Sequence, residues 1–305
     1  MQSEQANIIP LVEGNKTINT TFAYSGVGCG VKAVVDDENR RLVTIQGDEQ
    51  HPANYGRLCS KGSSLGETLS LEGRLLTPRI NGKPTSWPTA VDKVAQEFKR
   101  MIAKYGRESV AFYVSGQILT EDYYVANKLM KGYIGTANID TNSRLCMSSA
   151  VAGYKRAFGA DTVPASYDDF DHADLIVLVG SNTAWCHPIL FQRIKAAKVQ
   201  RPQLKVVVID PRETATHEIA DLHLPLKAGT DVLLFNALLV KLAERQVLDP
   251  QYIAQYTVDF DKAFASANRD VGDINTLATR IGISDEQLNT FFDWFYLLDN
   301  VQHDL

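Results

Sequence analysis

Two runs of aliphatic residues constrain the fold of this chain more than any other feature. The segments "DLIVLVGSN" and "KVVVIDPR" each hold a continuous apolar run that ends in a small polar turn. Similar runs in "SVAFYVSG" and "LHLPL" alternate with segments of helical pattern, which we expect to begin at Thr120, Cys146, Pro188 and Asp231. Aliphatic strands separated by helices favour a parallel sheet covered on both faces. The sequence therefore predicts an α/β fold, which binds ligands beyond the carboxyl ends of its strands.

The chain has 305 residues and three expected parts. We expect an arm over residues 1–18 and a small β-rich unit over residues 19–75, in which "VKAVVDDENRRLVTIQGD" predicts a β-hairpin. Residues 76–305 are expected to form a Rossmann-like, mostly parallel sheet with helices on both faces, with a sub-boundary near residue 140. The β-rich unit has few apolar residues, so we expect it to be stabilised by docking onto the α/β region.

Charge and cysteine usage exclude several classes of protein. The net charge of −5 gives no electrostatic argument for binding nucleic acid or an anionic membrane. No apolar run is long enough to span a bilayer, and the first residues show no export signal. The four cysteines are too scattered for a disulfide framework. We therefore expect a cytoplasmic protein.

Polar turns follow three of the expected strands. Each turn leads into a helix N-terminus, an arrangement that suits the recognition of phosphate, ribose or base. None matches G-x-G-x-x-G, so an ordinary NAD site is poorly supported. Any one of them alone is best interpreted as an ordinary turn, whereas three in series favour a nucleotide-like ligand. The candidate residues are Gly180, Ser181, Asn182, Asp210, Arg212, Gly229, Thr230 and Asp231.

Six motifs, in their order along the chain, resemble the molybdopterin oxidoreductase family. The resemblance is specifically to assimilatory-type bacterial nitrate reductases, which carry a bis-molybdopterin guanine dinucleotide. It extends from Thr21 to about Phe295, whereas the catalytic chains of that family are much longer, so it covers only their N-terminal portion. The motifs are "GVGCGV", "GRLCSKG", "NIDTNSRLCMSSAVAGY", "VGSNTAWCHP", "VIDPRETAT" and "LHLPLKAGTD".

The resemblance implies roles for individual residues. Cys146 would ligate molybdenum, a soft thiolate on a soft metal; without the flanking motif, a buried inert cysteine would be the better interpretation. Met147 stands where formate dehydrogenases of the family usually have histidine, which favours nitrate. Lys61 would lie between an iron–sulfur cluster and the pterin, while Gln117 and Asn142 would line the pterin and the metal. The turns would bind the guanine dinucleotide arms; the alternative for each polar residue is a solvated or backbone-capping role.

One loop departs from the family pattern. Where the family has C-P-Y-C-G-V-G-C-G, this chain has F-A-Y-S-G-V-G-C-G, so Phe22 and Ser25 replace two cluster ligands. Cys29 and Cys59 remain as residual iron–sulfur ligands. Because a 4Fe–4S cluster is normally held by four thiolates, we expect that it is lost and that Phe22 fills the vacated space.

Three functional hypotheses remain open. In the first, the chain is a component of a nitrate reductase, which reduces nitrate to nitrite by oxygen-atom transfer at molybdenum with electrons from a donor protein. It would be inactive by itself and would need a complementing chain. In the second, it is a non-catalytic binding module that retains a pterin or guanine-nucleotide pocket, or only a partner surface. In the third, it is a structural remnant without a ligand.

Overall fold

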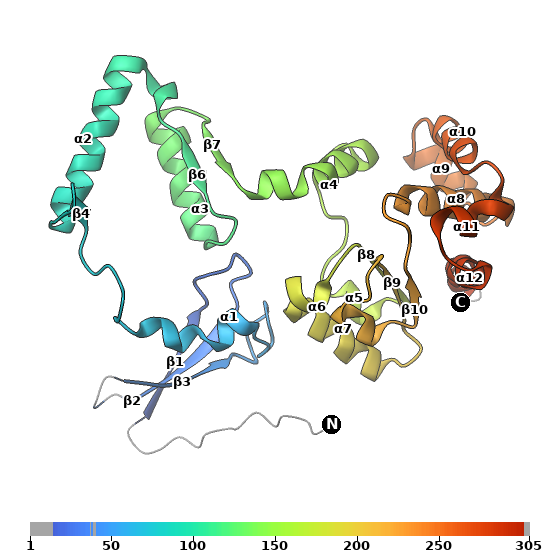
Figure 1. Cartoon of the computed structure of the whole chain (residues 1–305), viewed down its shortest axis with the longest axis horizontal. Helices are drawn as coiled ribbons and strands as arrows, with labels where there is room; N and C mark the ends of the chain where they lie inside the picture. Colours follow the sequence, from blue (N-terminus) through green and yellow to red (C-terminus); the bar gives the residue numbers. More distant parts are fainter. Residues whose placement is uncertain (1–14, 37, 39–40, 302–305) are drawn as a thin grey trace. The chain divides into compact units, whose positions relative to one another are not determined.

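A computed structural model describes residues 15–36, 38 and 41–301 (Figure 1). The chain separates into two compact units, Met1–Val163 and Pro164–Leu305, and each is described by itself. Most of the expected arm lies outside the described residues, but residues 15–18 belong to a strand. This division groups residues by compactness and does not test our domain bounds, which stay a prediction.

The first unit begins with a three-stranded antiparallel sheet in the order β1-β2-β3. The second and third strands form the predicted hairpin. The first strand pairs with the other edge of β2, from Asn15 opposite Asp36 to Thr21 opposite Gly30. The elements of this part are β1 (Asn15–Thr21), β2 (Gly30–Asp36), β3 (Arg41–Gly47), α1 (Ser60–Ser63) and the 3-10 helix η1 (Leu65–Leu69).

The rest of the first unit holds a two-stranded parallel sheet, β6-β7, with helices before and after each strand. Its elements are β4 (Arg79–Ile80), β5 (Lys83–Pro84), α2 (Trp87–Tyr105), η2 (Arg107–Ser109), β6 (Phe112–Val114), α3 (Thr120–Asn127), the π-helix η3 (Lys128–Ile134), β7 (Ile139–Thr141) and α4 (Ser143–Phe158).

Helix α2 begins earlier than its sequence pattern predicts. The apolar spacing places the start at Thr89, with Thr89 and Asp92 as a capping pair. Instead, the Ser86 hydroxyl accepts a hydrogen bond from the backbone N–H of Thr89, so Ser86 is the N-cap and Trp87 the first residue. Pro88 suits this position because the first turn of a helix does not need its missing N–H.

The second unit is built on a three-stranded parallel sheet in the order β10-β9-β8. Among the described residues of the chain, no helix is both long and apolar enough to cross a membrane. The elements are α5 (Asp169–His172), β8 (Leu175–Val179), α6 (Thr183–Cys186), α7 (Pro188–Gln200), β9 (Lys205–Ile209), η4 (Ala215–Ile219), β10 (Leu222–Leu224), α8 (Asp231–Glu244), α9 (Pro250–Tyr256), α10 (Phe260–Val271), η5 (Ile274–Thr276), α11 (Leu277–Ile281) and α12 (Asp285–Val301).

The central strand β9 separates two hydrophobic cores. Val207 and Ile209 pack with residues of α8, α10, α11 and α12, while Val206 and Val208 pack with residues of α7 and η4. This alternation follows from the two-residue period of a strand, and it explains why the aliphatic run is continuous. Helices on both faces of a parallel sheet are confirmed. The predicted strands, however, form two parallel sheets rather than one, since β6 pairs with β7 and not with β8–β10.

Candidate functional site

The carboxyl ends of β6 and β7 bring two predicted residues to neighbouring loops. The Asn142 Oδ1 atom accepts a 2.8 Å hydrogen bond from the backbone N–H of Gly116, which ties the loop after β7 to the loop after β6. A Cβ atom at Gly116 would lie 2.6 Å from the Ser143 Oγ atom, so the close approach favours glycine. Beside it, the Gln117 Oε1 atom accepts a 3.1 Å hydrogen bond from the Lys61 Nζ atom. Lys61, Gln117 and Asn142 are therefore connected at one end of this sheet.

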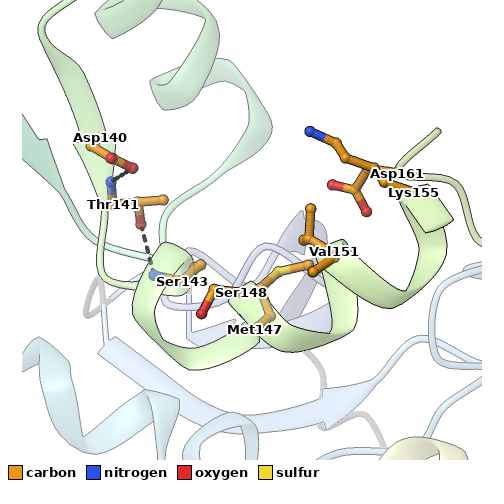
Figure 2. A pocket seen from close by; sticks show the side chains of 9 residues that line it. Asp140, Thr141, Ser143, Met147, Ser148, Val151, Lys155 and Asp161 are labelled. Atoms are coloured by element: carbon orange, nitrogen blue, oxygen red, sulfur yellow. Dashed lines mark hydrogen bonds between the residues drawn. The ribbon is translucent and has the colours of Figure 1, made fainter. Parts of the chain in front are cut away.

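Helix α4 follows directly and carries Cys146 in its first turn. The Cys146 side chain lies outside the described part of the structure. A cavity of about 430 Å³ lies along α4 (Figure 2). One end is formed by Asp140 and Thr141 at the end of β7, and Lys155 and Asp161 flank the other end, with Met147 and Val151 between them.

The carboxyl ends of β8 and β9 form a second, smaller cavity in the second unit. About 140 Å³ in volume, it is lined by Asn182, Trp185, Arg212, Glu213, Thr214 and Ala215. Two predicted residues, Asn182 and Arg212, thus line one cavity. Asp210 stabilises the loop after β9, because its Oδ1 atom accepts a 2.8 Å hydrogen bond from the backbone N–H of Arg212.

A buried threonine supports the β8 side of this cavity. Thr216 is fully buried, and its Oγ1 atom donates to Asn182 Oδ1 (3.3 Å) and accepts from the backbone N–H of Ala184 (3.1 Å). The Ser181 and Thr183 hydroxyls share a 2.7 Å hydrogen bond. Gly180 has φ +56°, a conformation that favours glycine.

The third predicted turn is not part of the 140 Å³ cavity. Gly229 has φ +83°, and the Thr230 hydroxyl donates a 2.7 Å hydrogen bond to the carbonyl oxygen of Lys227. Asp231 is the first residue of α8, where a carboxylate compensates the helix dipole. The Thr230 side chain makes no cap hydrogen bond to α8, and its hydroxyl bonds instead to the backbone three residues earlier.

The cysteine loop has an apolar interior. Phe22 is only 1% exposed; its backbone N–H donates to the carbonyl oxygen of Cys29 (2.8 Å), and its ring meets that of Tyr24 edge to face. The Ser25 hydroxyl accepts a 3.3 Å hydrogen bond from the backbone N–H of Val27. Phe22 is thus buried, as the repacking hypothesis requires.

The two remaining loop cysteines are thiols in different surroundings. Cys29 is buried, and burial raises its pKa because the thiolate is poorly solvated there; the like charge of Cys59 raises it further. Cys59 is half-buried and directly precedes α1, without a side-chain hydrogen bond to the helix N-terminus. Asn54 clamps the two segments together: its Nδ2 atom donates to the carbonyl oxygens of Gly30 and Arg57, at 3.0 and 2.8 Å.

These residues do not fit a 4Fe–4S cluster held by four thiolates. Within the described residues, no group of three or more histidine, cysteine, aspartate or glutamate side chains could hold a metal ion. The strand-end cavity is more suitable for a ligand, since it combines a guanidinium, an amide and an exposed indole, at Arg212, Asn182 and Trp185. Groups of these kinds recognise phosphate, ribose and base, and a cavity of about 140 Å³ accommodates part of a nucleotide.

Sequence reasoning missed several residues of these sites. Trp185, Glu213 and Thr216 lie within the quoted motifs, close to strand ends, and that position was a signal which could have identified them. Thr216 and Asn54 act through hydrogen bonds to residues far away in the sequence, and no local pattern identifies that role.

Comparison with known proteins adds independent findings. The family model described as the molybdopterin oxidoreductase Fe4S4 domain matches residues 16–70, and the one described as molybdopterin oxidoreductase matches residues 74–253. The chain is 51% identical to a nitrate reductase of Klebsiella oxytoca over 276 residues and 49% identical to one of Shewanella frigidimarina over 281 residues. These alignments cover 90% of this chain but only 31% and 30% of the two relatives. The chain therefore spans about a third of the length of these curated relatives.

Two further proteins are similar over most of this chain. A periplasmic nitrate reductase of Desulfovibrio desulfuricans is 42% identical over 247 residues, 79% of this chain and 32% of the relative. The solved structure of acetylene hydratase from Pelobacter acetylenicus matches with a TM-score of 0.73, covering 91% of this chain and 38% of that one. Its sequence identity is 23%, so this likeness concerns the fold alone.

Proposed function

Because this chain belongs to the molybdopterin oxidoreductase family, we propose that it forms the cofactor-binding part of a molybdenum-dependent nitrate reductase. The observation that carries the proposal is the 51% identity to the Klebsiella oxytoca nitrate reductase over nine-tenths of this chain. An F420-dependent formate dehydrogenase subunit of Methanocaldococcus jannaschii is more distant, at 34% identity. The proposed substrate is nitrate, and the proposed electron source is a donor protein.

The residues of the first unit would hold the metal end of the cofactor. When bound, a molybdenum–pterin group supplies oxygen-atom transfer, which nitrate reduction requires. Cys146, in the first turn of α4, would ligate molybdenum as a thiolate, a soft ligand for a soft metal. Lys61 would present a positive charge to the pterin, held in position by its hydrogen bond to Gln117.

The second unit would bind a guanine dinucleotide arm at the ends of β8 and β9. Arg212 would pair with phosphate, and Asn182 would donate hydrogen bonds to an arm of the cofactor. Titration calorimetry with GDP, and with ADP as the control nucleotide, tests this part. We expect weak heats with GDP that Arg212→Ala abolishes; equal or absent heats for both nucleotides would contradict it.

We also propose that the chain holds no 4Fe–4S cluster, since two of the four ligand positions are Phe22 and Ser25. Electrons from a donor protein would then have no route through this loop. We therefore expect no nitrate reduction by the chain alone, and we propose that activity needs a complementing chain.

A chimera tests the nitrate reductase proposal. This chain would replace the matching stretch of the Klebsiella oxytoca enzyme, with Phe22→Cys and Ser25→Cys restoring the ligand set. We expect nitrate reduction with a reduced viologen dye, and we expect Cys146→Ser to abolish both molybdenum binding and turnover. Molybdenum binding without any nitrate reduction would contradict the proposal.

Molybdenum binding without nitrate reduction would instead support a non-catalytic binding module. The observation that favours this second candidate is the contrast between the cysteine loop, filled by Phe22, and the strand-end cavity, whose two loops are each supported by a hydrogen bond to a side chain, that of Thr216 or that of Asp210. A binding module would bind the nucleotide and would not gain activity when the cysteines are restored.

We finally propose an assimilatory role in the cytoplasm. The support is the resemblance of the motifs to assimilatory-type enzymes. Fractionation of cells that express the gene from its own promoter tests the location, and recovery from the periplasm would contradict the proposal.

A further inference from the structure

The segment 76–163 has defined helices and strands but almost no core of its own. In the part of this segment that the structure describes, only Val110, Met130 and Thr136 are buried. Both hydrophobic clusters lie instead in the second unit. Because secondary structure in globular proteins depends mainly on the packing of apolar faces, this segment needs further covering surface to be stable.

Helix α2 carries an uncovered apolar stripe in this segment. Trp87, Val91 and Val94 are spaced by four and three residues, so they form one stripe along the helix. They are 68%, 58% and 54% exposed. The stripe continues to Phe98, which is half-buried and contacts Phe112 of β6 with a ring-centroid distance of 6.3 Å. The same face is therefore packed toward its C-terminal end and bare toward its N-terminal end.

The parallel sheet beside this helix is also incomplete. Among the described residues, β6 and β7 pair only with each other, so each strand has an outer edge without a ladder partner. Tyr113, on the face of β6 opposite Phe112, is 70% exposed. Purely parallel sheets are normally buried on both faces and have more than two strands.

We propose that the α2 stripe and the open β6–β7 sheet form a docking surface for the polypeptide that makes up the remaining two-thirds of the nitrate reductase relatives. Such a partner must offer an apolar surface for Trp87, Val91 and Val94, together with a strand that pairs with an outer edge of the sheet. The relatives have this additional length, since this chain covers only 31% of the Klebsiella oxytoca enzyme. The proposal rests on family membership and not on nitrate turnover.

Thiol labelling measures directly whether the α2 stripe is covered by the remainder of the enzyme. Cysteine is introduced at Val91 on the stripe, and as a matched control at Gln96, which is exposed on the opposite side of α2. Each variant is prepared in the full chain and in the chimera with the remainder of the Klebsiella oxytoca enzyme. A maleimide is added, and labelling of the α2 peptide is followed by mass spectrometry, which separates it from the exposed Cys186.

We expect Val91→Cys to be labelled rapidly in the chain alone and about tenfold more slowly in the chimera. Gln96→Cys should be labelled at the same rate in both. A second variant, Val94→Glu, should restore rapid labelling of Val91→Cys in the chimera, while Gln96→Glu should not.

Three results would overturn the proposal. In the first, labelling of Val91→Cys is equally fast in both proteins. In the second, labelling is slow in the chain alone and depends on its concentration, which would make a second copy the occupant. In the third, the chimera stays insoluble while the Klebsiella oxytoca enzyme folds in the same host, because the surface would then not accept that remainder. None of these readouts depends on activity, so failure of the nitrate proposal is distinguishable.

Discussion

Replacing Phe22 by alanine tests whether apolar packing stabilises the cysteine loop. Phe22 is 1% exposed, and truncation of a buried phenylalanine costs about 3–5 kcal/mol. We expect the lower end, about 3 kcal/mol, because the neighbouring Tyr24 is 46% exposed and can relax into the space. The matched control is Tyr24→Ala, which removes the edge-to-face contact from a half-exposed position and should cost about 1 kcal/mol.

The assay is native-state hydrogen exchange of the amides in β1–β3, because the two units need not unfold together and a single melting temperature would mix them. A loss of about 3 kcal/mol corresponds to exchange that is about 150-fold faster. The amides of β8–β10 should not change. If Phe22→Ala accelerates exchange in β1–β3 no more than Tyr24→Ala does, the loop is not stabilised by this side chain and the repacking hypothesis is wrong.

Further substitutions and labelling rates test other contacts. At neutral pH, Cys29 should react with iodoacetamide far more slowly than the exposed Cys186, as measured by peptide mass spectrometry. The pKa of Cys29 is raised, so less of it is thiolate than in a free cysteine, and its labelling should increase only at higher pH. Thr216→Val should lower the free energy of unfolding of the second unit by about 1–3 kcal/mol in urea titrations, because it removes the buried hydroxyl that bonds to the partly buried Asn182 side chain and Ala184 N–H. A Cβ atom at Gly47 would overlap a backbone carbonyl oxygen, so Gly47→Ala should destabilise β1–β3 in hydrogen exchange. A Cβ atom at Gly153 in α4 would meet no other atom, so Gly153→Ala should stabilise that helix by about 0.5–1 kcal/mol and slow its hydrogen exchange. Faster exchange in Gly153→Ala, or slower exchange in Gly47→Ala, would refute the steric argument.

The second unit was predictable from sequence because its strands are buried on both faces. The run at Val206–Ile209 has apolar side chains at every position, and each face meets a separate helical layer. The strand β7 was not predicted, since Ile139–Thr141 has only three residues and includes Asp140. Strand pairing was not predictable either, because an aliphatic run reveals burial but not the neighbouring strand.

The candidate sites were predictable where chemistry lies next to a strand end. Asn182 and Arg212 follow consecutive strands, so the sheet itself brings them together. The link from Lys61 to Gln117 spans 56 positions, and the resemblance to the family, rather than any local pattern, pointed to both residues. The roles predicted for these residues remain predictions.

Iron counting tests the central claim that the cysteine loop has exchanged its cluster for apolar packing. The chain and its Phe22→Cys/Ser25→Cys variant are reconstituted anaerobically with iron and sulfide, and iron per chain is measured together with visible absorption. We predict no bound iron in the unaltered chain and about four irons, with a broad thiolate-to-iron band, in the variant. About four irons in the unaltered chain would contradict the account.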